Sequence, residues 1–233
     1  MIKSIFFDFN GVIIDDETIQ MNAYREVLKE HDIDLTEEWY FEALGMDDKT
    51  FVKAMFQRAN KQLSDAAQKS VLDAKSVLHR KMIEDELPLF PGVLTLLKAT
   101  SRHFSLGLVS MASATEISYV FEQAKLGPLF TVLVMAGDVS VCKPAPDCYQ
   151  RGLEKLNEHR QGERLLPLLP QECVAIEDSP PGIQSARDAG MYTIGVTNTV
   201  REDALRSAGA HVVTRSLADW TVDAVKLVFG DDH

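Results

Sequence analysis

Short apolar runs alternate with longer amphipathic stretches along most of the chain. The runs are rich in branched and aromatic residues and have no regular polar interruption, so they predict strands that are buried on both faces of a parallel sheet. The predicted strands are Ile5 to Phe7, Phe104 to Val109, Thr131 to Met135, Cys173 to Ile176, Tyr192 to Val196 and His211 to Val213. Strands that alternate with helices in this way are typical of a doubly wound α/β fold.

Helix signals fall between the predicted strands. Ser113 and Glu116 have the spacing of a capping box, and Gly127 is expected to end the helix that they begin. Pro180 opens a further helix, which Gly190 is expected to close. These signals support the alternation of strands and helices.

One long region breaks the alternation, because residues 16–89 contain no convincing strand pattern. Ser64 has the side chain of a helix N-cap. The apolar residues that follow it at helical spacing are Ala67, Val71, Ala74 and Leu78. We therefore predict an all-helical domain of residues 16–89, inserted into a core of residues 1–15 and 90–233. Within the core, residues 157–170 are predicted to form a polar surface loop.

The composition is that of an ordinary globular protein with an acidic balance. Of the 233 residues, 45% are hydrophobic, which is enough for a sizeable core. The formal net charge of -11, with no basic run, argues against nucleic-acid binding. The three cysteines form no C-x-x-C pair, and no apolar stretch reaches the length of roughly 18 residues needed to span a membrane. We expect a cytoplasmic protein with reduced thiols and no membrane contact; its oligomeric state is open, with a monomer favoured.

Polar residues follow the predicted strands at the points where the strands end. They are Asp8 and Asn10 after the first strand, Ser110 after the second, Lys143 after the third, and Glu177 and Asp178 after the fourth. Because the carboxyl ends of parallel strands share one edge of a sheet, we expect these side chains to converge. Facing carboxylates repel one another unless a cation lies among them, and oxygen ligands suit Mg²⁺. A Lys and a Ser opposite the carboxylates would hold phosphate oxygens, so the set favours phosphoryl transfer.

Each of these residues alone has a simpler structural explanation. Asp8 suits a turn, Asp178 an N-cap, Lys143 a solvated surface and Ser110 a hydrogen bond at the end of a strand. Their joint occurrence in this order, each at a strand end, is what argues for chemistry.

These segments resemble the four motifs of the haloacid dehalogenase superfamily. They read Asp8-Phe-Asn-Gly-Val, Ser110, Lys143-Pro-Ala-Pro-Asp and Glu177-Asp-Ser-Pro-Pro-Gly. With the helical insertion, they look like its beta-phosphoglucomutase-like and phosphatase subgroup, and the resemblance covers essentially the whole chain. It implies a Rossmann-like core with a mobile, all-helical cap domain that closes over the site.

The resemblance also implies roles for individual residues. Asp8 would be the nucleophile, which forms an aspartyl-phosphate. Mg²⁺ would be held by Asp8, by the backbone carbonyl of Asn10 and by Asp178, with Glu177 nearby. The phosphoryl group of a small phosphorylated metabolite would be bound by Ser110, Met111 and Lys143.

Position 10 departs from the family pattern. Phosphatases and phosphomutases that this chain resembles have Asp there as general acid and base. Asn10 keeps the carbonyl, but its amide cannot transfer a proton, and the loss of general acid–base help typically costs about 10²- to 10⁴-fold in rate. Three explanations stay open: a natural Asn10 with slow turnover or another proton source, an engineered substitution, or a non-catalytic binding or regulatory protein.

The predicted cap weighs against a mutase. Mutases of the subgroup carry a His where this chain has Gln20 and an Arg in the first cap loop, where it has Met46-Asp47-Asp48-Lys49. Lys49 or Lys53 would suit a phosphonatase, which forms a Schiff base on a cap lysine, but lysines on an exposed helix are usually solvated. We expect a magnesium-dependent phosphatase, slowed by Asn10; the alternatives are a sugar-phosphate mutase and a non-catalytic phosphometabolite-binding protein.

Overall fold

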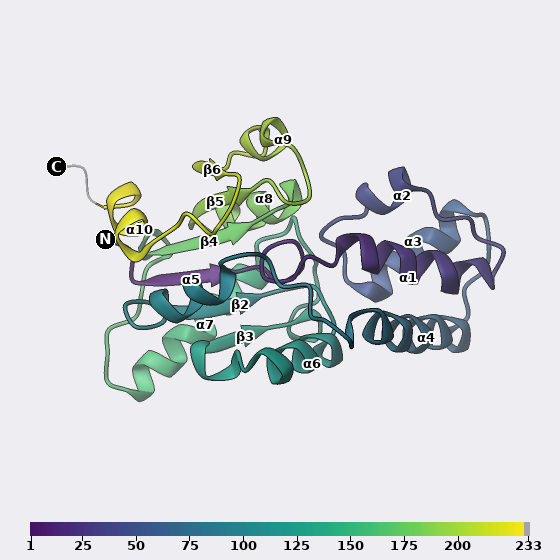
Figure 1. Ribbon diagram of the computed structural model, residues 1–233, viewed down its shortest axis with the longest axis horizontal. Helices are drawn as coiled ribbons and strands as arrows, with labels where there is room; N and C mark the ends of the chain where they lie inside the picture. Colours follow the sequence, from purple (N-terminus) through teal and green to yellow (C-terminus); the bar gives the residue numbers. More distant parts are fainter. Residues whose placement is uncertain (231–233) are drawn as a thin grey trace.

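The computed structural model describes residues 1–230, and its centre is a six-stranded, fully parallel sheet in the order β3-β2-β1-β4-β5-β6 (Figure 1). The strands are β1 (Ser4–Phe7), β2 (Ser105–Val109), β3 (Val132–Val134), β4 (Cys173–Glu177), β5 (Tyr192–Val196) and β6 (Val212–Thr214). All six strand predictions are confirmed, with small shifts at the ends. The central strands β1 and β4 are buried along their whole length, as their uninterrupted apolar sequences require.

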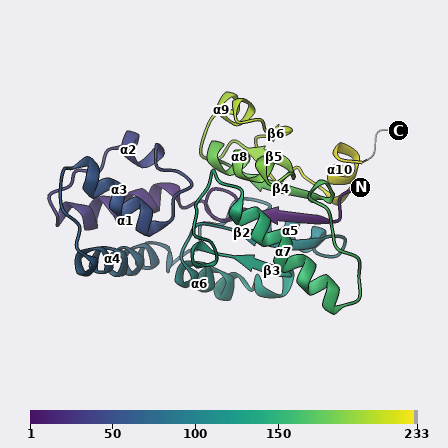
Figure 2. The ribbon, with the colours of Figure 1, turned by 180° about the vertical axis from the view of Figure 1, so that it is seen from behind.

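Helices cover both faces of the sheet, so the fold is a doubly wound α/β fold (Figure 2). Side chains of α5, α6 and α10 pack in one apolar cluster with β1 and β2, and those of α7 and α8 pack in a second cluster on the other face. The helices of this part of the chain are α5 (Val93–Thr100), α6 (Ala114–Ala124), α7 (Asp147–Gly162), α8 (Pro180–Asp188), α9 (Glu202–Ser207) and α10 (Val222–Val228). Short 3-10 helices lie at Gly127–Leu129, Ala136–Asp138 and Pro170–Glu172.

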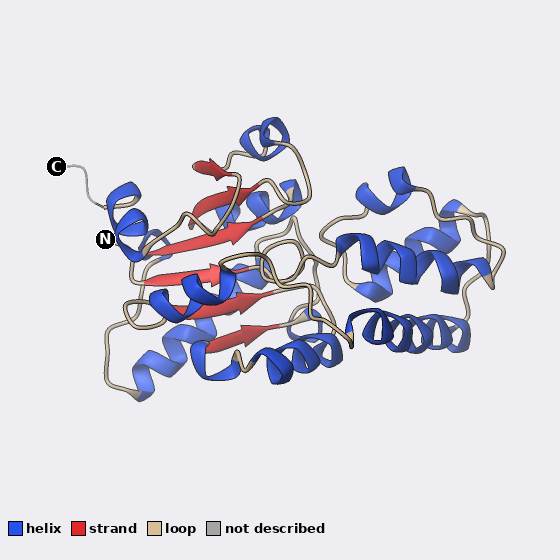
Figure 3. Cartoon of the chain, viewed as in Figure 1, coloured by secondary structure: helices blue, strands red, loops and turns tan. Residues whose placement is uncertain are grey.

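Four helices form a separate group beside the sheet, toward which the strand arrows point (Figure 3). They are α1 (Glu17–Lys29), α2 (Glu37–Phe41), α3 (Asp48–Arg58) and α4 (Asp65–Ile83). The group has an apolar cluster of its own, in which the Tyr24 and Phe51 rings lie 4.3 Å apart between centroids. Ser64 caps α4 by accepting a hydrogen bond from Ala67 N, as predicted. We call this group the cap; the division at residues 16 and 89 stays a prediction, and residues 231–233 of the predicted core lie outside the described part.

Two local predictions are wrong. Helix α6 ends at Ala124, because Lys125 adopts the left-handed conformation (φ 55°) that terminates it, and Gly127 begins a 3-10 helix instead. Residues 157–162 belong to α7 rather than to a loop. Leu156, just before this segment, is fully buried on the inner face of the helix. Asn157 forms two hydrogen bonds with the backbone of Leu168: its Oδ1 accepts from Leu168 N at 2.7 Å, and its Nδ2 donates to Leu168 O at 3.0 Å.

The order of the strands determines where a ligand can bind. The chain moves outward from β1 through β2 to β3, and then crosses to β4 on the other side of β1. Open α/β sheets bind ligands outside the carboxyl ends of the strands at such a reversal. Here that edge lies between the sheet and the cap. Within residues 1–230, no helix is both long enough and apolar enough to span a membrane.

Candidate active site

Three carboxylates meet at the ends of β1 and β4. Asp8 follows β1, Glu177 ends β4 and Asp178 follows it, and the two strands are direct neighbours with Phe7 beside Ile176. One oxygen from each of the three carboxylates lies within 4.8 Å of the others. Burial and the charge of Asp8 raise the pKa values of Glu177 and Asp178 well above their ordinary values. Such crowding is the expected signature of a cation site, because a divalent ion would offset the repulsion.

Two glycines allow the backbone to approach these carboxylates. A Cβ at Gly11, which has a φ of 71°, would stand 1.9 Å from Asp178 Oδ2. A Cβ at Gly182, in the first turn of α8, would stand 1.9 Å from Glu177 Oε2. Neither position can therefore carry a side chain without moving a carboxylate. The glycines of the Asp-x-Asn-Gly and Glu-Asp-x-x-x-Gly segments thus have a steric role.

Lys143 provides a positive charge directly beside the carboxylates. Its ammonium lies 3.0 Å from Asp8 Oδ1 and 2.7 Å from Glu177 Oε1. Burial disfavours the charge, but Asp8 and Glu177 outweigh this effect and raise the pKa of Lys143 well above its ordinary value. The ammonium is therefore charged at neutral pH. Tyr149, which the sequence analysis does not single out, also donates a hydrogen bond to Glu177 Oε1 from its buried position on α7.

Most of the predicted site residues line one cavity, of about 100 Å³, between the sheet and the cap. Ser110 and Met111 are buried there just after β2, and the Ser110 Oγ accepts a hydrogen bond from Ala112 N at 3.0 Å. The predicted residues that line this cavity are Asp8, Asn10, Ser110, Met111, Lys143 and Asp178. Glu177 lies behind them, with no exposed surface, and its Oε2 has no hydrogen-bond partner. The structure thus brings all seven predicted residues together.

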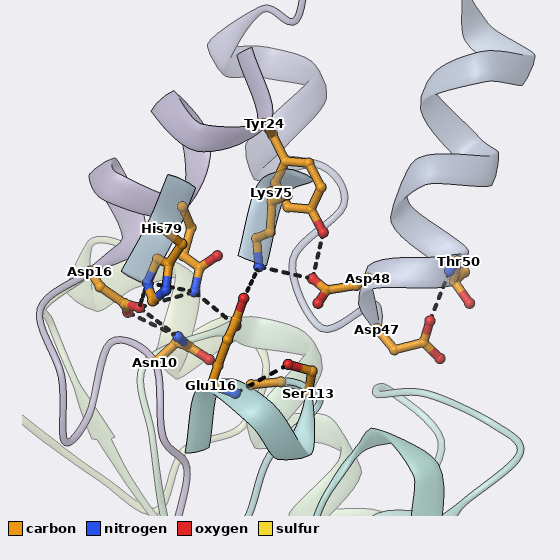
Figure 4. A network of polar contacts seen from close by, with 12 residues as sticks. Asn10, Asp16, Tyr24, Asp47, Asp48, Thr50, Lys75, His79, Ser113 and Glu116 are labelled. Carbon is orange, nitrogen blue, oxygen red and sulfur yellow. Dashed lines mark hydrogen bonds and ion pairs between the residues drawn. The ribbon is translucent and has the colours of Figure 1, made fainter. Parts of the chain in front are cut away.

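The side chain of Asn10 is directed toward Asp16 (Figure 4). Its Nδ2 lies 2.9 and 3.0 Å from the two carboxylate oxygens of Asp16, which is fully buried. His79 of α4 approaches the same carboxylate, with Nε2 2.8 Å from Asp16 Oδ2. Since an ionised carboxylate only accepts hydrogen bonds, both nitrogens must donate to it. The Asn10 amide is therefore held by a residue at the start of the cap.

The cap also contributes polar residues to the cavity, and the sequence analysis missed most of them. Glu17, Tyr24, Asp48 and Lys75 line it from the cap, and Glu116 lines it from α6 of the core. Glu116 was expected to complete a capping box, but its side chain bonds Lys75 at 2.7 Å instead. Burial, with the charges of Asp16 and Asp8, raises the pKa of Glu17 to about 7. Lys49 and Lys53 are exposed and do not line the cavity, as expected of solvated charges.

The chain belongs to the haloacid dehalogenase-like hydrolase family, whose model matches residues 5–196. It is 26% identical to a phosphorylated carbohydrates phosphatase of Thermotoga maritima, over 89% of this chain and 92% of that protein.

Solved structures share the fold of this chain. The fold matches a beta-phosphoglucomutase of Clostridium difficile with a TM-score of 0.84 at 23% identity, over 98% of this chain and 97% of that one. It also matches CbbY of Rhodobacter sphaeroides, solved as an aspartate-to-asparagine mutant in complex with xylulose 1,5-bisphosphate, with a TM-score of 0.79 at 25% identity over 94% and 96% of the two chains. The Rossmann-like core with a helical cap is therefore confirmed, and the relatives are phosphatases and phosphomutases.

Proposed function

We propose that this chain is a magnesium-dependent phosphatase that hydrolyses a small phosphorylated metabolite through an aspartyl-phosphate on Asp8. The observation that carries the proposal is the convergence of Asp8, Asp178 and Lys143 in one cavity between the sheet and the cap. Phosphoryl transfer needs mainly positioning and stabilisation of charge, and this set of residues supplies both. The name of the Thermotoga maritima relative supports a phosphorylated carbohydrate as the class of substrate.

The residues fit the magnesium that the family implies. Three carboxylates converge, and burial together with the charge of Asp8 raises the pKa values of two of them, Glu177 and Asp178. The Glu177 Oε2 has no hydrogen-bond partner and lies behind the other two carboxylates. Asp8, Asp178 and the backbone carbonyl of Asn10 would hold the ion, and Glu177 would support them from behind. When bound, Mg²⁺ supplies charge that offsets the carboxylates and the phosphate oxygens.

The chain's own residues would carry out the transfer. The Asp8 carboxylate is oriented by Phe9 N, which donates to Oδ1 at 2.8 Å, and by Lys143. In the first step a bond forms between an Asp8 oxygen and phosphorus, and the bond from phosphorus to the ester oxygen breaks. Lys143 and Ser110 hold the phosphoryl oxygens. In the second step water attacks the phosphorus, inorganic phosphate leaves, and the Asp8 carboxylate is regenerated.

Proton transfer is the weak part of this mechanism. The departing oxygen needs a proton and the attacking water must lose one, but Asn10 can do neither. We therefore propose slow turnover with water or a substrate group as the proton carrier. The rival proposal is a phosphometabolite-binding protein without turnover. The hydrogen bonds from Asn10 Nδ2 to Asp16 favour it, because the amide there supports a buried carboxylate and not a leaving group. A sugar-phosphate mutase is the third candidate, and it lacks its histidine at Gln20.

Substitution of the nucleophile tests the proposal. Asp8→Asn should lower phosphate release from a panel of sugar and short-chain phosphates by about 10³-fold or more, because no carboxylate remains to attack phosphorus. Asp219→Asn changes an exposed Asp in the same way and should keep wild-type activity. Chelation of Mg²⁺ should stop release in the wild type, and added Mg²⁺ should restore it. Equal rates in Asp8→Asn and wild type would refute the assignment of Asp8.

A further inference from the structure

The cavity has two ends that differ in charge. Asp8, Asp178 and Lys143 lie at the end assigned to the phosphoryl group. Asp48, Lys75 and Glu116 also line the cavity, and their contacts with one another place them together on the cap side, where the rest of a substrate would enter. Two acidic residues thus face one basic residue at this cap end. Asp48 and Glu116 outweigh the single charge of Lys75.

The one ammonium at the cap end is already neutralised (Figure 4). Lys75 is 1% exposed, and its Nζ lies 2.7 Å from Glu116 Oε1 and 3.2 Å from Asp48 Oδ1. Tyr24 directs its hydroxyl to the same Asp48 carboxylate and lies with its ring 4.9 Å from the ammonium. Among the residues that line the described cavity, no Arg and no His is present to receive a second anion.

Gln20 adds a specific requirement at this end. It is 6% exposed and lines the cavity, and its Oε1 has no hydrogen-bond partner. Its Nε2 lies 3.0 Å from Asp16 Oδ2 and 3.4 Å from Glu116 Oε2. The two carboxylates favour this orientation of the amide, although its Nε2 also lies 3.1 Å from His79 Nε2, which donates to Asp16. In this orientation the buried Oε1 is an acceptor that needs a donor, and a buried polar group without one is costly.

We propose that the cap end of the cavity selects phosphomonoesters whose remaining part donates hydrogen bonds and carries no negative charge, as hydroxyl- or amine-bearing groups do. A hydroxyl or ammonium group satisfies Gln20 Oε1 and faces carboxylates that accept hydrogen bonds. A carboxylate or a second phosphate meets acceptors and negative charge without a free cation, and is rejected by repulsion. This selectivity rests on the proposed phosphatase function, whose site provides the phosphate end.

Matched pairs of phosphate esters test the selectivity. Glycerol 3-phosphate and 3-phosphoglycerate differ by a hydroxymethyl group against a carboxylate, and ethanolamine phosphate and phosphoglycolate differ by an aminomethyl group against a carboxylate. The wild type with Mg²⁺ should show a kcat/KM at least about tenfold higher for the first member of each pair, a difference that one repulsive charge supplies. Dissociation constants measured by calorimetry on Asp8→Asn, which does not consume the ligand, should rank in the same order.

The two readouts separate failure of this inference from failure of the proposed function. Turnover that depends on Asp8 but is equal or faster for the carboxylate members overturns the selectivity and leaves the phosphatase intact. No turnover, with binding ranked as expected, overturns the phosphatase and keeps the selectivity. No binding of any of the four ligands, or equal binding within both pairs, overturns the selectivity.

A charge substitution gives an independent check. Glu116→Gln keeps the shape of the side chain but removes one of the two charges that neutralise Lys75. We expect it to narrow the preference for glycerol 3-phosphate over 3-phosphoglycerate by about tenfold. Asp48→Asn, on a partly exposed residue, should act in the same direction and serves if Glu116→Gln does not fold. An unchanged ratio in a folded variant, verified by its thermal melt, overturns the proposal.

Discussion

The substitution Asn10→Asp would give the site the proton carrier that this chain lacks. The new carboxylate would replace an Nδ2 that lies 2.9 and 3.0 Å from the Asp16 oxygens. Two unit charges about 3 Å apart, at an effective dielectric constant of about 20, repel by about 5 kcal/mol. Keeping an ordinary Asp protonated at pH 7 costs about 4 kcal/mol, from a reference pKa of about 3.9. The repulsion is the larger of the two, so the variant should bind one extra proton near neutral pH, on the new carboxyl group, on Asp16 or on His79 beside it.

A proton held between close carboxylates is what a general acid needs. We therefore expect Asn10→Asp to raise kcat/KM for phosphate release by about 10²- to 10⁴-fold. Thermal stability should fall, because the hydrogen bond to Asp16 is exchanged for a strained pair. Phosphate release should be followed from pH 5 to 9 at saturating Mg²⁺, together with the melting temperature.

A matched control separates the carboxyl group from the loss of the amide. Asn10→Ala also releases Asp16 but adds no proton carrier, so it should lose stability and gain no activity. Equal rates in the two variants would show that any gain comes from freeing Asp16. A folded Asn10→Asp protein that gains less than about threefold would refute the idea that the site is complete except for its acid and base.

Two further outcomes test the geometry of the site. Gly182→Ala should weaken the apparent Mg²⁺ affinity in activation assays by about 10- to 100-fold, because the new Cβ would stand 1.9 Å from Glu177 Oε2. Gly162→Ala is the control, since a Cβ there meets nothing within 4 Å, and it should leave the Mg²⁺ affinity unchanged. Equal effects of the two substitutions would contradict a supporting role of Glu177. Cys142 joins the core to the cap, because its Sγ donates to Asp47 Oδ2 at 3.2 Å, and burial together with Asp47 raises the pKa of this thiol. Its labelling by a thiol reagent at pH 8 should slow at least about threefold when Mg²⁺ and inorganic phosphate are added, and an unchanged rate would show that the ligand does not favour the closed cap.

The core of the site could be predicted from the sequence because its residues are fixed by strand ends. Asp8 and Asp178 come together wherever two neighbouring parallel strands end, whatever the helices between them do. The same argument places Lys143 near them only approximately, since Lys143 lies in a loop. Its position beside Asp8 was expected from the order of the motifs. Tyr149 gave no signal, because a Tyr on the apolar face of α7 resembles any core residue.

The cap end of the cavity could not be predicted, because its polar residues occupy positions of a core. The apolar spacing of α4 indicated a buried face through Ala67, Val71, Ala74 and Leu78. The buried face instead runs through Val71, Lys75, His79 and Ile83, so it includes two residues that a hydrophobic pattern assigns to solvent. Lys75 is buried because two carboxylates pair with it, Asp48 from α3 and Glu116 from α6. Such a pair has no signature in either helix alone.

Asn10 and the cap are matched to each other through Asp16. A fully buried carboxylate is tolerated only when donors surround it, and Asp16 has three side-chain donors in Asn10, Gln20 and His79. Two of them come from helices of the cap, and the third precedes the cap in the chain. Because Asp16 and His79 both belong to the predicted cap domain, opening of the cap would separate Asn10 from Asp16 and take one donor from this buried carboxylate. The asparagine is therefore not an isolated change at the proposed catalytic site: the local environment uses its amide, and any substitution there should alter cap closure.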